Sequence, residues 1–435
     1  MYRVSTASIE LDMIQTAGIG ALALVVGMVL TRKVAFLQKF CIPSPVSGGL
    51  IFSFITLALY SGFHIEVSFD GTLRDVFMLA FFTSVGFQSD LKVLRQGGRL
   101  LTIMLLLLAV MITMQNLMPM GITRLMDVNP LVGMACGSIS MTGGHGTAGG
   151  FAKVLEGMGL HGAGTIGMAA ATFGLIAGSV VGGPLAERII RTKLTHEQMQ
   201  PQDGEIDPAM AGIESDEASP TGRTKRISTN EQEFQQYAKA TYFILLVMAG
   251  GTLLSWLFAK TGITFPTYFG ALILAAIVRN VVGVIRYKED DGENQSSGKW
   301  VRADKLLDMD RIISVGNISL SMFLGMAMIS LKLWELQSLA LPLIVILVSQ
   351  VFMMALFAYF VAFPLLGRDY DAAVLCAGMC GFGLGATPNA MANMSAVCYK
   401  YRYTVKPFLI VPIIGAMFAD FINTGMITLF LNLLC

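Results

Sequence analysis

The sequence predicts an all-α membrane protein of about ten transmembrane helices, arranged as two inverted five-helix repeats that each contain a glycine-rich re-entrant hairpin. Of the 435 residues, 54% are hydrophobic and only 14% are charged, whereas about 25% are charged in ordinary soluble domains. Apolar stretches long enough to cross a bilayer recur along the chain, and its two halves resemble each other. This composition excludes a soluble globular enzyme.

The charges are balanced, with 30 Lys and Arg against 29 Asp and Glu. A formal net charge of +1 creates no global field that would attract nucleic acid, so we expect no nucleic-acid partner. The six cysteines show neither paired CxxC spacing nor neighbouring histidine ligands. Neither a disulfide framework nor a transition-metal site is indicated.

Ten segments approach the length of a spanning helix, which is roughly 20 mainly apolar residues for a hydrocarbon core about 30 Å thick. No positively charged region precedes the first segment, which is too long for a signal-peptide core, so we expect no cleavage. The predicted spans are Leu11 to Leu30, Val46 to Gly62, Leu73 to Gln88, Leu100 to Met120, Gly162 to Ala186, Ala240 to Ala259, Pro266 to Ile285, Ile312 to Leu331, Leu339 to Phe363 and Phe408 to Leu433.

The Lys and Arg residues of the short loops predict the orientation. If the N-terminus lies outside, most loop cations face the cytoplasm and only scattered ones, such as Lys153 and Lys332, face the outer side. Because the number of predicted spans is even, the C-terminus then also lies on the outer side. The loop cations that then face the cytoplasm include Arg32, Lys33, Lys39, Lys92, Arg95, Arg99, Arg188, Arg191, Arg286, Arg311, Arg368, Lys400 and Arg402.

A polar segment divides the chain into three parts. Residues 194–238 contain three prolines and lack apolar periodicity, as is typical of a flexible linker. We interpret them as a cytoplasmic linker between a first repeat, residues 1–193, and a second repeat, residues 239–435.

The two halves match at one constant offset of 240 positions, which pairs Leu91-Lys92 with Leu331-Lys332 and Cys136 with Cys376. Two matches at one offset favour a duplication. Because each half has five spans, an odd number, the second half enters the membrane from the opposite side. The result is the inverted repeat typical of secondary transporters.

A glycine-rich segment interrupts each half, at Gly133 to Gly150 and at Ala377 to Ala390. Their glycines, and Pro388 in the second, oppose a continuous helix. Unpaired peptide groups cost several kcal/mol each in hydrocarbon, so such breaks occur only where they line protein or a wet cavity. We therefore predict re-entrant hairpins near residues 128–155 and 372–397, with tips that meet near the midplane.

Small residues can also serve only to let helices pack closely. We give that interpretation to Gly174, Gly178, Gly182 and Gly183 of the fifth span. For the two hairpins we favour binding, because a run with threonines and a histidine between four glycines is hard to explain by packing.

The ends of broken helices predict the chemistry of the site. A half-helix N-terminus offers N–H groups to a carboxylate, and exposed carbonyls coordinate Na⁺. Thr142 and Thr147 in the first tip, with Thr387 and Asn389 in the second, add side-chain oxygens. His145, at the first tip, either contacts the substrate, relays a proton or satisfies an ordinary hydrogen bond.

Polar residues in other spans predict a sodium site. Asp420 lies inside the last span, and Asn423 follows one turn later. Since intramembrane carboxylates are costly, we interpret Asp420 as a cation ligand; its alternative is pairing with a buried polar group. Asn317 either packs between helices or adds an ion ligand, and Ser140 completes the predicted set.

Several long strings resemble the glutamate:sodium symporter family of bacteria: GSISMTGGHGT, ATFGLIAGSVVGGP, DAAVLCAGMCGFGLGATPNAMANM, GNISLSMFLGMAMISLKLWEL and VPIIGAMFADFIN. The resemblance implies Na⁺-coupled uptake of L-glutamate across the inner membrane, by a homodimer whose transport domains move against a fixed scaffold. It also implies two re-entrant loops at the glycine strings and a role for Asp420 and Asn423. The loop residues that carry over are Gly143, Gly144, His145, Gly146, Thr147, Gly383, Gly385, Thr387 and Pro388.

The chain departs from the family pattern at Thr142, where serine is expected, at Met379, where histidine can occur, and at Asn389, where threonine is common. We predict a symporter and not an enzyme, with Na⁺ as coupling ion and no organic cofactor. A passive organic-anion channel is the alternative. An intramembrane hydrolase is a weaker one, because Asp420 is a solitary deep carboxylate and His145 has no evident nucleophilic partner.

Overall fold

The computed structural model describes residues 7–91, 98–194, 226–282, 286–289, 299–302 and 307–434. Most of the predicted linker, residues 195–225, and the predicted cytoplasmic cations Lys92 and Arg95 lie outside the described residues. The helix α10 begins at Arg226, so the end of the predicted linker is helical.

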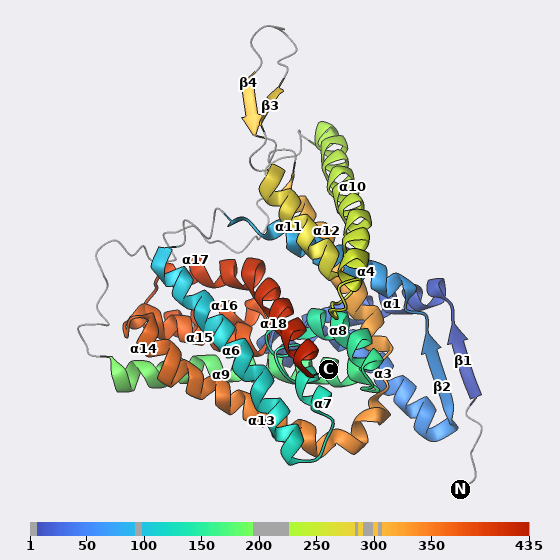
Figure 1. Cartoon of the computed structure of the whole chain (residues 1–435), viewed down its shortest axis with the longest axis horizontal. Helices are drawn as coiled ribbons and strands as arrows, with labels where there is room; N and C mark the ends of the chain where they lie inside the picture. The colour runs from blue at the N-terminus through green and yellow to red at the C-terminus, as the bar shows by residue number, and fades with distance from the viewer. Residues whose placement is uncertain are drawn as a thin grey trace.

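The described helices form two bundles that lie side by side (Figure 1). We call the first the frame bundle. It contains α1 (Met13–Lys33), α2 (Ala35–Lys39), α3 (Ser44–Phe63), α4 (Thr72–Gln88), α10 (Arg226–Ala259), α11 (Phe269–Val282) and α12 (Met309–Ile329).

We call the second the hairpin bundle, because it carries both glycine-rich segments. A 3₁₀ segment, η3 (Leu333–Leu339), leads into it from α12. It contains α6 (Gly98–Leu125), α7 (Pro130–Ala135), α8 (Gly144–Gly157), α9 (Ala163–Lys193), α13 (Ala340–Phe357), α14 (Phe363–Leu366), α15 (Tyr370–Leu384), α16 (Thr387–Lys400), α17 (Lys406–Ile413) and α18 (Ala419–Leu434), with the π-helical segments η4 (Ala358–Ala362) and η5 (Ile414–Phe418).

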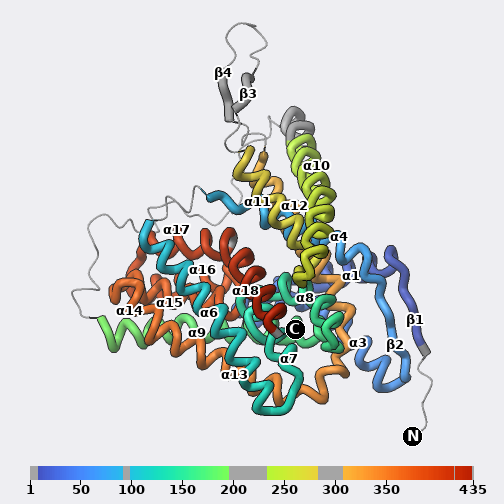
Figure 2. The backbone as a smooth tube through the Cα atoms, in the orientation of Figure 1, coloured from blue at the N-terminus to red at the C-terminus, as the bar shows by residue number. Residues whose placement is uncertain are grey.

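Each half of the chain contributes to both bundles. Within the frame bundle, α4 packs against α11 and α12, and α1 packs against α3 and α12. Within the hairpin bundle, α15 packs against α9 and α16, and α6 packs against α7, α13 and α18. The trace in Figure 2 shows the same division, with the blue segments and the yellow-green to yellow α10 and α11 in one bundle and the cyan, green, orange and red segments from α6 to α9 and α13 to α18 in the other.

Seven helices of the described ranges are long and apolar enough to cross a membrane. They correspond to predicted spans one, two, four, five, six, eight and nine. The third, seventh and tenth predicted spans coincide with α4, α11 and the interrupted α17–α18 run, which are shorter or broken. A total of ten spans and the inversion of the halves stay predictions.

Two short strand pairs, which the sequence did not predict, extend from the frame bundle. β1 (Ala7–Leu11) pairs in parallel with β2 (Ile65–Phe69), and β3 (Arg286–Glu289) pairs in antiparallel with β4 (Lys299–Arg302). Both pairs lie outside the helices of the frame bundle, with β1 before α1 and the other three strands between successive helices, and they contribute no layer to its packing.

Carboxylate and amide caps begin several helices. The Asp12 side chain accepts a hydrogen bond from the Gln15 N–H at 2.8 Å, and the Asp369 side chain accepts one from the Ala372 N–H at 2.8 Å. The Asn129 side chain accepts from the Leu131 N–H at 2.9 Å and begins α7. Each cap satisfies an N–H that has no partner inside its helix.

Glycines of α9 let the second glycine-rich segment and the helix α16 that continues from it lie close to α9. A Cβ on Gly174 would lie 2.2 Å from the Leu384 carbonyl oxygen, and one on Gly182 would lie 2.2 Å from the Asn393 amide nitrogen. The packing interpretation is therefore confirmed for these two glycines. Gly183 differs, because nothing lies within 4 Å of the same position.

Candidate functional site

Both glycine-rich segments interrupt a helix, as predicted. In the first, α7 ends at Ala135 and α8 begins at Gly144, with a buried non-helical stretch between them. In the second, α15 ends at Leu384 and α16 begins at Thr387, and the two helices pack against each other. Their re-entrant course in a bilayer stays a prediction.

The two breaks line one cavity of about 400 Å³ between the bundles. On the frame side, α4 and α12 supply Phe81, Phe82, Val85, Gln88, Asn317, Leu320 and Leu324. On the hairpin side, the predicted residues that line it are Thr142, Gly143, Gly144, His145, Gly146, Thr147, Gly385, Thr387, Pro388 and Asp420. The sequence therefore identified most of the polar wall contributed by the hairpin bundle.

Four predicted residues do not line this cavity. The Gly383 carbonyl accepts from Gln115 Nε2 at 2.6 Å, and Asn389 Nδ2 donates to the Leu175 carbonyl at 2.8 Å. Ser140 Oγ lies 2.5 Å from the Ala135 carbonyl and 2.9 Å from the Gly167 carbonyl. The fourth, Asn423, is fully buried beneath the first break. The Gly383 carbonyl and the Asn389, Ser140 and Asn423 side chains thus bond to neighbouring parts of the hairpin bundle.

Two helix N-termini open into the cavity without side-chain caps. Gly143 precedes α8 and Ala386 precedes α16, and neither supplies a side-chain cap hydrogen bond. The first N–H groups of a helix have no partner inside it, and the helix dipole makes that end positive. No Lys or Arg is among the described residues that line the cavity. An anion in this cavity is therefore met by peptide N–H groups.

Buried amide side chains from neighbouring helices replace hydrogen bonds that the breaks lose. Gln115 donates to the Gly383 carbonyl and accepts from Thr142 Oγ1, both at 2.6 Å. Gln350 Nε2 donates to the Gln115 carbonyl at 2.8 Å and to the Cys136 carbonyl at 3.2 Å. Sequence reasoning missed these glutamines. The available signal was an amide inside an otherwise apolar span, which in a membrane protein indicates a bond to another helix.

The contacts of His145 define its neutral tautomer. His145 Nε2 lies 3.0 Å from Thr172 Oγ1, which donates its own proton to the Met168 carbonyl at 2.9 Å. A hydroxyl has one proton to donate, so Nε2–H is the donor toward Thr172. The other ring nitrogen, Nδ1, then carries no proton and can accept a hydrogen bond.

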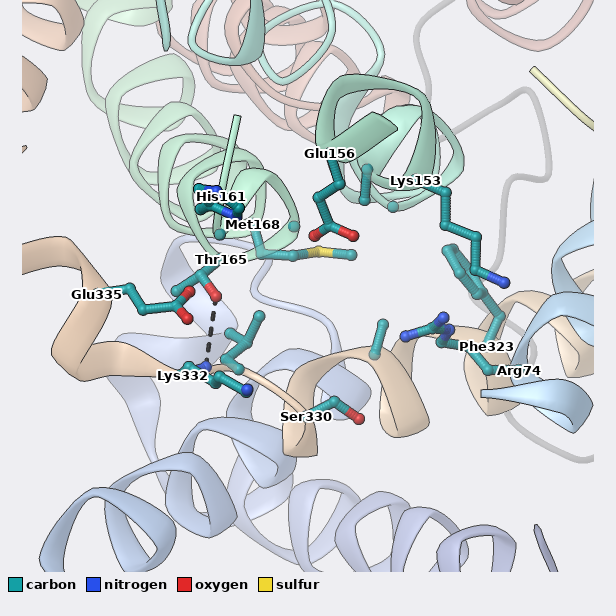
Figure 3. Close-up of a pocket in the computed structure, with 16 residues that line it drawn as sticks. Arg74, Lys153, Glu156, His161, Thr165, Met168, Phe323, Ser330, Lys332 and Glu335 are labelled. Atoms are coloured by element: carbon teal, nitrogen blue, oxygen red, sulfur yellow. Dashed lines mark hydrogen bonds between the residues drawn. The ribbon is translucent and has the colours of Figure 1, made fainter. Parts of the chain in front are cut away.

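A second cavity, also about 400 Å³, lies between the bundles near the C-terminal end of α8 (Figure 3). Charged side chains from both bundles point into it, but most are paired. Lys332 binds Glu66 at 2.7 Å, and this hydrogen bond raises the pKa of Lys332. Asp75 pairs with Arg74 and, across the bundles, with Lys153. The Asp75–Lys153 ion pair at this cavity therefore connects the two bundles. The first cavity differs, because its described lining residues include no Lys or Arg.

Secondary transporters typically contain interrupted helices whose N-termini converge on a binding cavity. The cavity between the frame bundle and the hairpin bundle has this arrangement. The profile described as sodium/glutamate symporter matches residues 9–403. The chain is 38% identical over 430 residues to the sodium/glutamate symporters of Escherichia coli (strain K12) and Shigella flexneri, with 98% of each chain covered. It is 34% identical over 415 residues to that of Haemophilus influenzae, with 95% of each covered.

These matches confirm the resemblance read from the sequence, and the chain belongs to the sodium/glutamate symporter family. It is a multi-pass membrane protein of a family of transporters, not of enzymes.

Proposed function

We propose that the protein is a Na⁺-coupled symporter that imports L-glutamate across the bacterial inner membrane, with both termini on the outer side. The observation that carries this proposal is the pair of uncapped helix N-termini at one cavity between two helical bundles. The family membership supports the same ion and substrate, since the similar proteins of Escherichia coli and Haemophilus influenzae are named for both.

Two N-termini in one cavity suit a substrate with two carboxylates. The first turn of α8 offers the N–H groups of Gly144, His145 and Gly146. In the first turn of α16, Pro388 has no N–H and the Asn389 N–H bonds the Ala386 carbonyl, so Thr387 is the donor. We assign one carboxylate to each N-terminus, with the Thr142, Thr147 and Thr387 hydroxyls as further contacts.

Asp420 supplies the negative charge for the coupling ion. Its carboxylate lines the same cavity and makes no hydrogen bond or ion pair within the described ranges. Asn317 approaches from the frame bundle. Symport then requires that bound Na⁺ raise the affinity for glutamate. By thermodynamic linkage, bound glutamate raises the affinity for Na⁺ by the same factor.

The division into two bundles supports an elevator-type cycle. The hairpin bundle carries both breaks, whereas α4 and α12 of the frame bundle form the facing wall. Movement of the hairpin bundle past that wall would expose the cavity alternately to each side. We also propose that the protein works as a homodimer, as the resemblance implies.

Uptake of radiolabelled glutamate into proteoliposomes, with and without an imposed Na⁺ gradient, tests the function. A symporter accumulates glutamate above equilibrium only with the gradient. A passive organic-anion channel gives gradient-independent flux that stops at equilibrium, and peptide turnover without a gradient would indicate a hydrolase. Replacing Asp420 or Thr387 by alanine should abolish accumulation, and wild-type uptake in both variants would exclude these positions.

A further inference from the structure

Two residues that contact each other beneath the first break, Ser138 and Asn423, each have a buried side-chain oxygen without a hydrogen-bond partner among the described residues. Ser138 and Asn423 are both 0% exposed, and neither Ser138 Oγ nor Asn423 Oδ1 has a hydrogen-bond partner within the described ranges. An unsatisfied buried polar group costs about 1–3 kcal/mol. The two residues contact each other through Asn423 Nδ2 and the Ser138 carbonyl, and both unpartnered oxygens carry lone pairs that a bound cation can use.

The surrounding contacts fix both side chains. Asn423 Nδ2 donates to the Ser138 carbonyl at 3.0 Å, and the Ser138 N–H donates to Asn116 Oδ1 at 2.9 Å. The Gly143 N–H also donates to the Ser138 carbonyl, at 2.9 Å. The backbone groups of Ser138 are thus satisfied, and its hydroxyl oxygen is the group left over.

A third oxygen lies against the same turn. A Cβ on Gly143 would lie 2.5 Å from Thr147 Oγ1 and 2.7 Å from Asn423 Nδ2. The Thr147 side chain is 1% exposed, lines the cavity and makes no hydrogen bond within the described part of the chain. Because Gly143 has no side chain, both groups can approach the turn from which α8 begins.

The local charge favours a cation over a bound water. Asp420 precedes Asn423 by one turn of α18, and its carboxylate also has no hydrogen-bond partner among the described residues. A water molecule would satisfy the oxygens but would leave this charge uncompensated in a low-dielectric site. One carboxylate with neutral oxygens suits a hard monovalent cation, since oxygen ligands are preferred by hard cations.

We propose that Ser138 Oγ, Asn423 Oδ1 and Thr147 Oγ1 coordinate a coupling Na⁺ beneath the first break, with Asp420 as its counter-charge. This inference rests on the proposed function, and it adds Ser138 and Thr147 to the residues that bind the ion. The Thr147 hydroxyl serves both ligands, because it can offer a lone pair to Na⁺ and its proton to the substrate carboxylate. Because Gly143 lies between the ion ligands and the N-terminus of α8, a bound Na⁺ orders the turn that receives the substrate carboxylate.

The test measures the Na⁺ dependence of glutamate uptake by the full-length reconstituted protein carrying Ser138→Ala or the near-isosteric Ser138→Cys. Loss of one oxygen ligand should raise the Na⁺ concentration for half-maximal uptake about tenfold, by the usual strength of a bond to a charged group. The KM for glutamate at saturating Na⁺ should stay near the wild-type value.

Thr123→Val is the matched control, because the Thr123 hydroxyl is equally buried in the hairpin bundle but already donates to the Met120 carbonyl at 2.9 Å. A second readout is the thermal stabilisation of the purified protein by Na⁺ without glutamate, since a ligand stabilises the state that it binds. The control should retain this stabilisation, and both Ser138 variants should lose most of it.

Wild-type Na⁺ dependence in both Ser138 variants would overturn the inference. Reduced uptake at every Na⁺ concentration with an unchanged half-maximal value would also overturn it, because Ser138 would then be structural. Failure of the proposed function is distinct, since the wild-type protein itself would show no Na⁺-dependent uptake.

Discussion

The carbonyl oxygen of Gly385 lies 3.4 Å from the point where a Cβ atom on Gly144 would stand. The two residues are more than half the chain apart, yet each marks the break in its own glycine-rich segment. The N-terminus of α8 and the turn before α16 therefore touch at the cavity.

Replacing Gly144 by alanine should strain the first tip. Gly144 has φ +59°, and an L-residue in the left-handed region costs about 1–2 kcal/mol. A distance of 3.4 Å to Gly385 is an ordinary contact, so the expected loss comes from the backbone and not from a clash. Thermal unfolding should show lower stability, and the KM for glutamate should rise.

Gly121→Ala is the control for this variant. Nothing lies within 4 Å of a Cβ at this position of α6, and alanine favours a helix over glycine by about 1 kcal/mol. Unchanged KM and stability in Gly144→Ala would show that the tip adapts without strain.

Replacing Gln115 by leucine should weaken both breaks, because Gln115 of α6 bonds directly to each glycine-rich segment. The change removes the donor to the Gly383 carbonyl and the acceptor of Thr142 Oγ1, and each unpaired buried group costs about 1–3 kcal/mol. We expect lower thermal stability and strongly reduced uptake. Gln337→Leu, at an exposed position of η3, should be neutral, and equal behaviour of the two variants would contradict the bridging role.

Much of this architecture follows from local sequence. Ala377–Ala390 contains Pro388, which a helix interior does not tolerate, shortly after a run of glycines. A break close to Gly385 was therefore predictable, even though Gly378, Gly381 and Gly383 lie inside α15. The apolar spans were likewise predictable from length and hydropathy. The position of His145 at a tip followed from the glycines on either side of it.

The long-range partners were not predictable in the same way. Whether Asn389 faces the cavity or Leu175 depends on the rotation of α16 against α9, which the pattern of one helix does not specify. The cavity wall supplied by Phe81 and Gln88 depends on how α4 meets the other bundle. The strands β1 and β2 pair residues far apart in the chain, and five-residue segments carry little periodicity.

Thr172→Val should alter substrate affinity through His145. The hydroxyl that accepts from His145 Nε2–H at 3.0 Å is lost, while the volume of the side chain is retained. The ring then loses the bond that selects its tautomer, so we expect a raised KM for glutamate with little change in stability. Thr172→Ser keeps the hydroxyl and should behave like the wild type. Wild-type affinity in the valine variant would show that the orientation of His145 does not matter for binding.

A cross-link between the bundles tests whether they must move. Asn432 of α18 and Thr264 of the α10–α11 loop are joined by two hydrogen bonds: the Thr264 N–H donates to Asn432 Oδ1 at 2.9 Å, and Asn432 Nδ2 donates to the Thr264 carbonyl at 3.3 Å. A Thr264→Cys/Asn432→Cys variant, bridged with a short bifunctional thiol reagent, should stop transport, because one partner belongs to each bundle.

The control pair, Leu91→Cys/Asn280→Cys, lies within the frame bundle, where the Leu91 N–H donates to Asn280 Oδ1 at 3.0 Å. Bridging this pair should leave uptake intact. If the bridged Thr264/Asn432 variant transported glutamate at its unbridged rate, relative movement of these two segments would not be part of the cycle.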